Sequence, residues 1–253
     1  MPFTFAHPAL VLPLRYGLGK RLSMTALIAG SVSPDLEYFV RMSVKGLYGH
    51  TPAGIFLLDI PLALLLTFTF HCVIREPLIQ NLPAFIRHRL WPLRLAISWP
   101  AYVKSHFAIV LLSLFIGALS HVIWDAFTHQ DAFFITLFGW QTISLNLLNH
   151  EIPLYRILQH ASTFIGLTAI AAYFYLTPKH AEKHSTISMR YWLTVSLVAL
   201  LITAIRLIWI YPHIPFGTAL VTAISALFIG LSFAPFLCGW AFKSSNERPR
   251  QLS

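Results

Sequence analysis

The chain has 253 residues, of which 57% are hydrophobic and only 11% are charged. Because soluble domains carry about 25% charged residues, this composition excludes an ordinary soluble enzyme and indicates a membrane protein. The formal net charge of +9 would suit nucleic acid in a soluble protein, but here Lys and Arg flank apolar blocks. In that position they orient membrane spans and meet anionic head groups. We therefore expect membrane lipids as partners and no nucleic acid.

The apolar residues form long blocks with no separate soluble segment, which predicts a single membrane-embedded domain over residues 1–253. We divide this domain into an N-terminal segment that contributes to a functional site (1–52), a transmembrane bundle (53–242) and a basic tail (243–253). The cysteines, Cys72 and Cys238, lie in apolar runs and predict neither a disulfide framework nor a zinc finger.

Short helices are expected before the first span. The first ten residues lack the basic start and long apolar centre of a secretory signal, so we expect them to be retained. His7 stands before a proline, a residue that is tolerated at the start of a helix. Ser33 and Pro34 form a second helix start, as cap and first helical residue, and they leave the Asp35 carboxylate beside the positive helix end.

About five transmembrane helices follow, so the predicted fold class is an all-α polytopic membrane protein. Thr51 caps the first span, Pro52 opens it, and His50 lies just outside it. The predicted spans cover residues 53–74, 107–127, 162–176, 191–211 and 216–242, and the third could begin nearer residue 160. Residues 75–105 are basic and rich in proline, which predicts a loop or a surface helix.

Positive charge predicts the orientation. Segments 75–105 and 178–190 and the tail are basic, and alternating spans bring all three to one side. That side should be the cytoplasm of a bacterial inner membrane, with the C-terminus inside. The N-terminal region and the end of the second span then share the other side, although the N-terminal region also carries five cations that contradict the rule. Either packing overrides the rule, or residues 22–39 cross or re-enter the bilayer.

The strongest chemical signal lies at the end of the second predicted span, in residues 120–129. His121, Asp125 and His129 are four residues apart and form a gently drifting stripe on one helix face, if the helix continues that far. Neutral imidazole suits zinc, iron or manganese, and a carboxylate between two histidines can bridge ions or orient a water molecule. The alternative is structural, with the same side chains hydrogen-bonding to one another and tying helices together.

The predicted orientation brings further ligand-type residues to the same side of the membrane as this stripe. His7, Asp35 and His50 precede the first span and belong to the same side. Hydrocarbon penalises charge, which makes a functional role the default for ionisable groups at membrane depth. We therefore predict a divided metal site whose ligands are His7, Asp35, His50, His121, Asp125 and His129.

Two further acidic residues receive other interpretations. Asp59, early in the first span, either supports the site from behind the ligands or is a carboxylate that is satisfied by other partners or lies at the membrane interface, and we leave it out of the ligands. Glu37 is expected at the surface.

Four blocks of sequence carry a family resemblance: residues 1–8 (MPFTFAHP), 30–39 (GSVSPDLEYF), 49–54 (GHTPAG) and 120–129 (SHVIWDAFTH). Through these blocks the chain resembles a bacterial membrane family catalogued as domain of unknown function 4184, and the similarity covers most of the chain. That family is similar in pattern to inner-membrane metal-dependent hydrolases, some of them labelled LexA-binding. The ligand order also resembles that of zinc-dependent phospholipase C and related nucleases.

The resemblance implies that the six predicted ligands hold one to three divalent ions, with zinc preferred, and hydrolyse a phosphoester or lipid-like substrate. On this interpretation the ions activate water and neutralise developing negative charge. Asp35 and Asp125 are then the catalytic carboxylates, with Asp35 as base or bridging ligand, while the histidines hold metal. The enzymes have further His and Glu ligands downstream, for which this chain offers only His150, Glu151 and His160.

Other enzyme classes lack support, since the chain has no HExxH pair, GxSxG elbow, Walker loop or dinucleotide fingerprint. The alternative function is non-enzymatic. In a membrane scaffold or small-solute transporter, the His/Asp cluster would lock helices or relay protons. A transporter should show interrupted helices in repeated halves, and the sequence has no such repeat.

Overall fold

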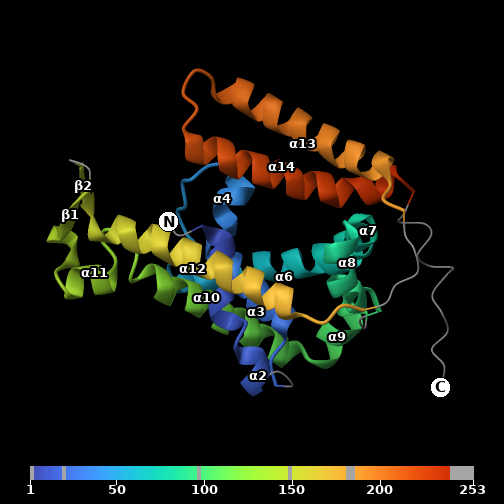
Figure 1. Cartoon of the computed structure of the whole chain (residues 1–253), viewed down its shortest axis with the longest axis horizontal. Coiled ribbons are helices and arrows are strands. Elements are labelled where there is room, and N and C mark those ends of the chain that lie inside the picture. Colours follow the sequence, from blue (N-terminus) through green and yellow to red (C-terminus); the bar gives the residue numbers. More distant parts are fainter. Residues whose placement is uncertain (1–2, 19–20, 96–97, 148–149, 181–185, 240–253) are drawn as a thin grey trace. The chain divides into compact units, whose positions relative to one another are not determined.

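The computed structural model describes residues 3–18, 21–95, 98–147, 150–180 and 186–239, and helices dominate these ranges (Figure 1). Among the described residues, five helices are long and apolar enough to cross a membrane: Pro52–Asn81, Phe107–Asp125, Leu154–Leu176, Met189–Ile210 and Phe216–Leu237. This confirms the predicted all-α membrane fold. The basic tail and the last three residues of the fifth predicted span lie outside the described residues.

The first span is longer than predicted. It runs without a break through α5 (Pro52–Gly54), the π-helix η3 (Ile55–Asp59), α6 (Ile60–Thr69), the π-helix η4 (Phe70–Ile74) and α7 (Arg75–Asn81). The apolar run stops at Arg75, but the helix does not, because the Arg75 guanidinium is largely buried and lies 2.9 Å from His71 Nδ1. The third long helix, α12 (Leu154–Leu176), also begins earlier than predicted.

Tertiary contacts divide the chain into two compact units. The first unit comprises Met1–Glu37, Gly46–Thr67 and Val103–Thr177, and the second comprises Tyr38–Lys45, Phe68–Tyr102 and Pro178–Ser253.

In the first unit, α3 (Met24–Val32) packs along α10 (Phe107–Asp125), which is the second span (Figure 1). A Cβ atom on Gly30 would lie 2.2 Å from the Leu114 carbonyl oxygen, and one on Gly117 would lie 2.4 Å from the Leu27 carbonyl oxygen. Two glycines therefore let the helix backbones touch, as small residues do in membrane proteins. This contact determines how far α10 is shifted along α3.

Short helices precede the first span, as predicted. They are η1 (Thr4–Ala6), α1 (Pro8–Val11), α2 (Leu14–Leu18), η2 (Ser33–Asp35) and α4 (Leu36–Arg41). Ser23 caps α3, because its side chain accepts a hydrogen bond from the Ala26 N–H. Val11, Leu22 and Leu27 form a buried apolar cluster that attaches α1 to α3.

The segment between the second and third spans contains a hairpin that was not predicted. α11 (Phe133–Leu137) and η6 (Trp140–Thr142) lead into β1 (Ser144–Leu147), which pairs antiparallel with β2 (His150–Pro153), with Leu145 opposite Ile152. Strands of four residues are too short to show a clear alternation of polar and apolar side chains.

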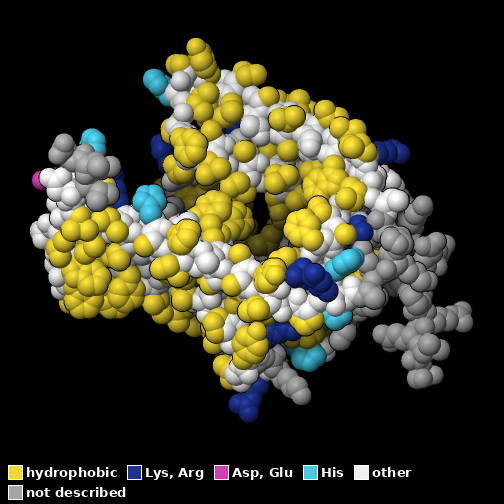
Figure 2. Space-filling view, viewed as in Figure 1, with side chains coloured by type: hydrophobic (Ala, Val, Ile, Leu, Met, Phe, Trp, Pro, Cys, Tyr) yellow, Lys and Arg dark blue, Asp and Glu magenta, His cyan; other side chains and the backbone are white. Residues whose placement is uncertain are grey.

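Most of the basic segment belongs to the second unit and is helical, the second of its two predicted alternatives: α8 (Ala84–Leu90) and η5 (Trp91–Leu95) follow α7, and α9 (Trp99–Ser105) comes next. α13 (Met189–Ile210) and α14 (Phe216–Leu237) form a pair around buried Tyr191, Val195 and Ala234 (Figure 1). On the face shown in Figure 2, hydrophobic side chains dominate and acidic ones are scarce, as expected of helices that face lipid.

Candidate metal centre

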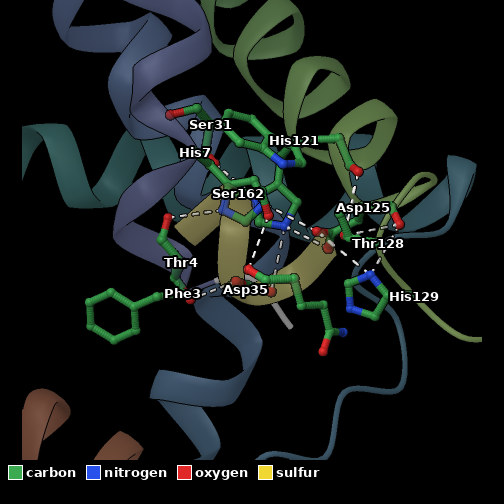
Figure 3. Close-up of polar contacts among 12 residues, drawn as sticks. Phe3, Thr4, His7, Ser31, Asp35, His121, Asp125, Thr128, His129 and Ser162 are labelled. Carbon is green, nitrogen blue, oxygen red and sulfur yellow. Dashed lines mark hydrogen bonds and ion pairs between the residues drawn. The ribbon is translucent and has the colours of Figure 1, made fainter. Parts of the chain in front are cut away.

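Five of the six predicted ligands come from four places in the first unit. His7 lies between η1 and α1, Asp35 ends η2, and His50 stands in the loop before the first span. His121 and Asp125 occupy the last turns of α10. Figure 3 shows the side chains of His7, His121 and Asp125 pointing toward one another, with Asp35 beside them.

Four of these residues form a group that could hold a metal ion: Asp35, His50, His121 and Asp125 each offer one ligand atom, all within 4.8 Å of one another. We call this group the ligand quartet. The two Nε2 atoms of His50 and His121 lie 3.3 Å apart. Asp35 Oδ1 lies 3.4 Å from His50 Nε2 and 3.6 Å from His121 Nε2. Asp125 Oδ2 lies 3.3 Å from each of the same two nitrogens.

The two remaining predicted ligands contact the other oxygen of Asp125. His7 Nε2 lies 3.1 Å from Asp125 Oδ1, and the His7 ring stacks on the His121 ring with centroids 3.7 Å apart. His129 is more peripheral, because α10 ends at Asp125 and the expected stripe of three side chains does not continue. Its Nδ1 lies 3.1 Å from the Asp125 carbonyl oxygen and 3.7 Å from Asp125 Oδ1.

Backbone carbonyl groups fix the orientation of two imidazole rings. His121 Nδ1 lies 2.7 Å from the Ser31 carbonyl oxygen on α3, and His7 Nδ1 lies 3.1 Å from the Thr4 carbonyl oxygen. A carbonyl only accepts hydrogen bonds, so Nδ1 carries the proton in both rings. In a neutral ring, Nε2 then carries the lone pair, and in both residues Nε2 faces a carboxylate.

Two side chains outside the predicted ligand set support the Asp35 carboxylate and the loop that carries His50. The Thr4 hydroxyl donates a 2.6 Å hydrogen bond to Asp35 Oδ2. Glu37, expected at the surface, is instead buried, and its carboxylate accepts 2.9 Å hydrogen bonds from the backbone N–H groups of Leu47, Tyr48 and Gly49. These bonds shape the loop that presents His50. The position of Glu37 two residues after Asp35 was the one sequence signal for a role at the site. Its bonding partners lie about ten residues further along the chain, so no local pattern connects them to it.

His50 itself adopts an unusual backbone conformation, with φ of 66°. Residues other than glycine seldom occupy this left-handed region, and when they do the surrounding contacts hold them there, often at functional sites. Its side chain is 26% exposed, whereas the Asp35 and His121 side chains are 0% exposed. Among the quartet, His50 therefore gives the most access from outside.

The electrostatics of the group reflect these pairings. Burial would raise the pKa of the Asp35 carboxyl, but the nearby imidazoles of His121 and His50 hold it below its ordinary value. Burial would likewise lower the pKa of His50, yet contacts with Asp125 and Asp35 raise it to about 9. For His129 burial prevails and lowers the pKa, although Asp125 opposes this. The carboxylates thus favour positive charge at the quartet, which a cation would also supply.

The downstream residues considered as additional ligands lie elsewhere in the unit. His150 and Glu151 are exposed on β2, and His160 is exposed on α12. None of them belongs to the quartet.

Comparisons with known proteins agree with the resemblance in the four sequence blocks. Residues 1–236 match the model of a family described as Domain of unknown function (DUF4184). Neither a curated protein nor a solved structure matches the chain. The match extends over the first four membrane spans, all but the last residue of the fifth, and every residue of the quartet. The chain therefore belongs to the DUF4184 family.

Proposed function

We propose that the chain is a membrane-embedded metal-dependent hydrolase acting on phosphoester or lipid-like substrates. The observation that carries this proposal is the spacing within the quartet, where five atom pairs lie 3.3–3.6 Å apart. Tetrahedral zinc, with bonds of about 2.0–2.1 Å, separates its ligands by about 3.3 Å. The quartet thus has the dimensions of a zinc coordination shell.

The protonation of the histidines supports the same assignment. Because Nδ1 of His7 and His121 is bonded to a carbonyl, Nε2 of each ring would turn its lone pair toward a carboxylate oxygen if the ring is neutral. Two acceptors facing each other repel unless a proton or a metal ion lies between them. Donation from the second ring nitrogen to a carbonyl is also the usual arrangement for metal-bound histidine. Neutral rings moreover suit the close stacking of His7 on His121 better than two cations would.

The carboxylates distribute their oxygens in a way that accommodates more than one ion. Asp125 Oδ2 belongs to the quartet, while Asp125 Oδ1 faces His7 Nε2, so Asp125 and His7 would be the residues to hold a second ion. We propose zinc, one to three ions in all, with His129 contributing at the periphery. Asp35 acts as a ligand rather than a base in this proposal, since Thr4 occupies its second oxygen.

Bound zinc supplies Lewis acidity and an activated water molecule to a hydrolytic reaction. The residues of the chain orient the reaction: buried Asp35 and His121 hold the inner side of the site, and the partly exposed His50 marks the side from which a phosphoester would approach. Because the site lies at the end of a membrane span, it suits a lipid-like substrate that resides in the membrane.

We also propose that the protein resides in a bacterial inner membrane with its C-terminus in the cytoplasm. The basic segment between the first two spans and the cations around 178–190 support this orientation. Fusion of a reporter that fluoresces only in the cytoplasm to the C-terminus tests it. A fusion protein that is inserted correctly but does not fluoresce would show that the C-terminus lies on the opposite side of the membrane.

The metal is tested by elemental analysis of protein purified in mild detergent, comparing wild type with His121→Ala and Asp125→Ala. We expect about one or more zinc ions per wild-type chain, their loss in both variants, and loss of phosphodiesterase turnover on lipid substrates. A wild-type protein free of stoichiometric metal after gentle extraction would refute the proposal. If His121→Ala lowered only thermal stability, the scaffold alternative would replace it.

A further inference from the structure

Asp59 is a buried carboxylate that the ligand quartet does not use. It lies on η3, in the part of the first span nearest to His50, and its side chain is 0% exposed. Both carboxylate oxygens are buried without a hydrogen-bond partner among the described residues. The expectation that Asp59 is satisfied by other partners is therefore not met within the described chain.

Such a carboxylate is costly in a helix that spans a membrane. Burying a charge without a partner loses its hydration, and proteins retain such groups mainly where a cation or a proton compensates them. Burial is the largest influence on the Asp59 carboxyl, and the ionisable groups that follow it are His50, His121, Glu37 and Asp35. Glu37 is itself satisfied by backbone N–H groups. The groups that bear on Asp59 are thus largely those of the metal centre.

The backbone brings Asp59 to this position through a π-helix. The Ile60 N–H bonds to the Ile55 carbonyl, which inserts one extra residue in the turn that ends at Asp59. π-Turns of this kind occur frequently at functional sites. η3 contacts both η2, which carries Asp35, and α10, which carries His121 and Asp125. The turn therefore places a third carboxylate next to the two elements that hold the quartet.

We propose that Asp59 is a positioning residue of the metal centre, whose charge stabilises the bound cation from outside the quartet, through water in the coordination shell. This inference rests on the proposed metal centre. The third carboxylate makes the field at the site more negative and so strengthens cation binding. In the metal-free protein the same charge is uncompensated, so Asp59 lowers stability while it raises metal affinity.

These opposite effects define the experiment. Zinc affinity is measured by competition with a chromophoric chelator, and thermal unfolding is followed on chelator-treated protein, for wild type, Asp59→Asn and Asp59→Glu. We expect Asp59→Asn to weaken zinc binding about 10- to 100-fold, as loss of an outer-shell partner does, with an unchanged or higher melting temperature of the metal-free protein. Asp59→Glu, which keeps the charge, should retain most of the affinity.

Thr67→Val is the matched control, since Thr67 is buried in the same span and its hydroxyl donates to the Leu64 carbonyl. It should leave zinc affinity unchanged. If Asp59→Asn binds zinc with wild-type affinity, the proposed role of Asp59 is wrong, although the metal centre stands. A lower melting temperature of the metal-free variant would also contradict that role, because it would reveal a structural partner of Asp59. Absence of zinc from the wild type would instead overturn the metal centre and this inference together.

Discussion

Two helix pairs of this protein both pack closely through glycine residues, but they bury different kinds of polar side chain. In the α3 and α10 pair, Gly30 and Gly117 let the backbones touch. In the α13 and α14 pair, Gly230 does the same, since a Cβ atom there would lie 2.7 Å from the Val195 carbonyl oxygen. Yet α10 buries His121 and Asp125, whereas the polar residues buried on α14 are hydroxyl residues such as Thr222 and Ser225.

The difference shows that close helix packing does not require ionisable groups. The Ser225 hydroxyl lies 2.8 Å from the carbonyl oxygens of Phe39 and Val221, so a nearby backbone group satisfies it. His121 and Asp125 need partners from η1, η2, α3 and the His50 loop. Since ionisable groups are expensive at membrane depth, their concentration on α10 is what distinguishes this pair and what the proposed metal centre would explain. Four predictions test this contrast.

The largest effect is expected from His121→Ala, which removes a ligand at the centre of the quartet. Zinc affinity should fall by about 100-fold or more, above the loss typical of outer-shell substitutions, as measured by chelator competition. Ser225→Ala, the counterpart on α14, should keep wild-type affinity. Equal losses in the two variants would mean that metal binding depends on global folding and not on the quartet.

Next come the packing glycines. Gly117→Leu and Gly230→Leu should each destabilise the protein by about 1–3 kcal/mol or more, because the added side chain meets backbone atoms. Only Gly117→Leu should also weaken zinc binding, since it moves His121 away from Ser31. Thermal unfolding and zinc titration on both variants separate these effects. Unchanged zinc affinity in Gly117→Leu would contradict the idea that the helix contact positions the site.

A smaller effect is expected from Thr4→Val, which removes the donor to Asp35 Oδ2 at nearly constant volume. Leaving that oxygen unsatisfied should cost about 1–3 kcal/mol and weaken zinc binding about tenfold. Thr222→Val is the control, because Thr222 donates to the Met42 carbonyl in the second unit. Thr222→Val should lower the stability of the protein without changing its zinc affinity. A loss of zinc affinity in this variant would contradict the contrast between the two helix pairs.

His129→Ala should have the smallest effect. Its Nδ1 contacts the Asp125 backbone more closely than the Asp125 carboxylate, so we expect a change in zinc affinity of less than about tenfold, below the usual loss for an outer-shell partner. Isothermal titration of the purified variant measures it. A loss as large as that in His121→Ala would make His129 an inner ligand and would extend the site beyond the end of α10.

Much of the fold and of the candidate site was accessible from sequence. Hydropathy located the five spans because a span depends on composition over about 20 residues. The i, i+4 spacing of His121 and Asp125 brought both into the quartet, since that relation lies within one helix. Boundaries were less accurate: the first span continues past Arg75 because its guanidinium contacts His71.

The features that sequence could not reveal depend on partners far away in the chain. From sequence, Glu37 looks like a surface residue. Only the folded structure shows that backbone N–H groups of the following loop donate hydrogen bonds to its carboxylate. Thr4 has no recognisable motif, and its bond to Asp35 depends on how η1 meets η2. The π-turn at Asp59 likewise has no marker in composition.

By itself, the sequence determined that this is a helical membrane protein with metal-type ligands at the ends of its first segments, because hydropathy, capping residues and helical spacing are local properties. Only the tertiary structure decided which of these side chains meet and in which order. Contact between His7 and Asp125, 118 residues apart, requires a particular crossing of α3 with α10. Two glycines and the backbone carbonyls of Thr4 and Ser31 determine that crossing and the ring orientations, and neither follows from any local pattern.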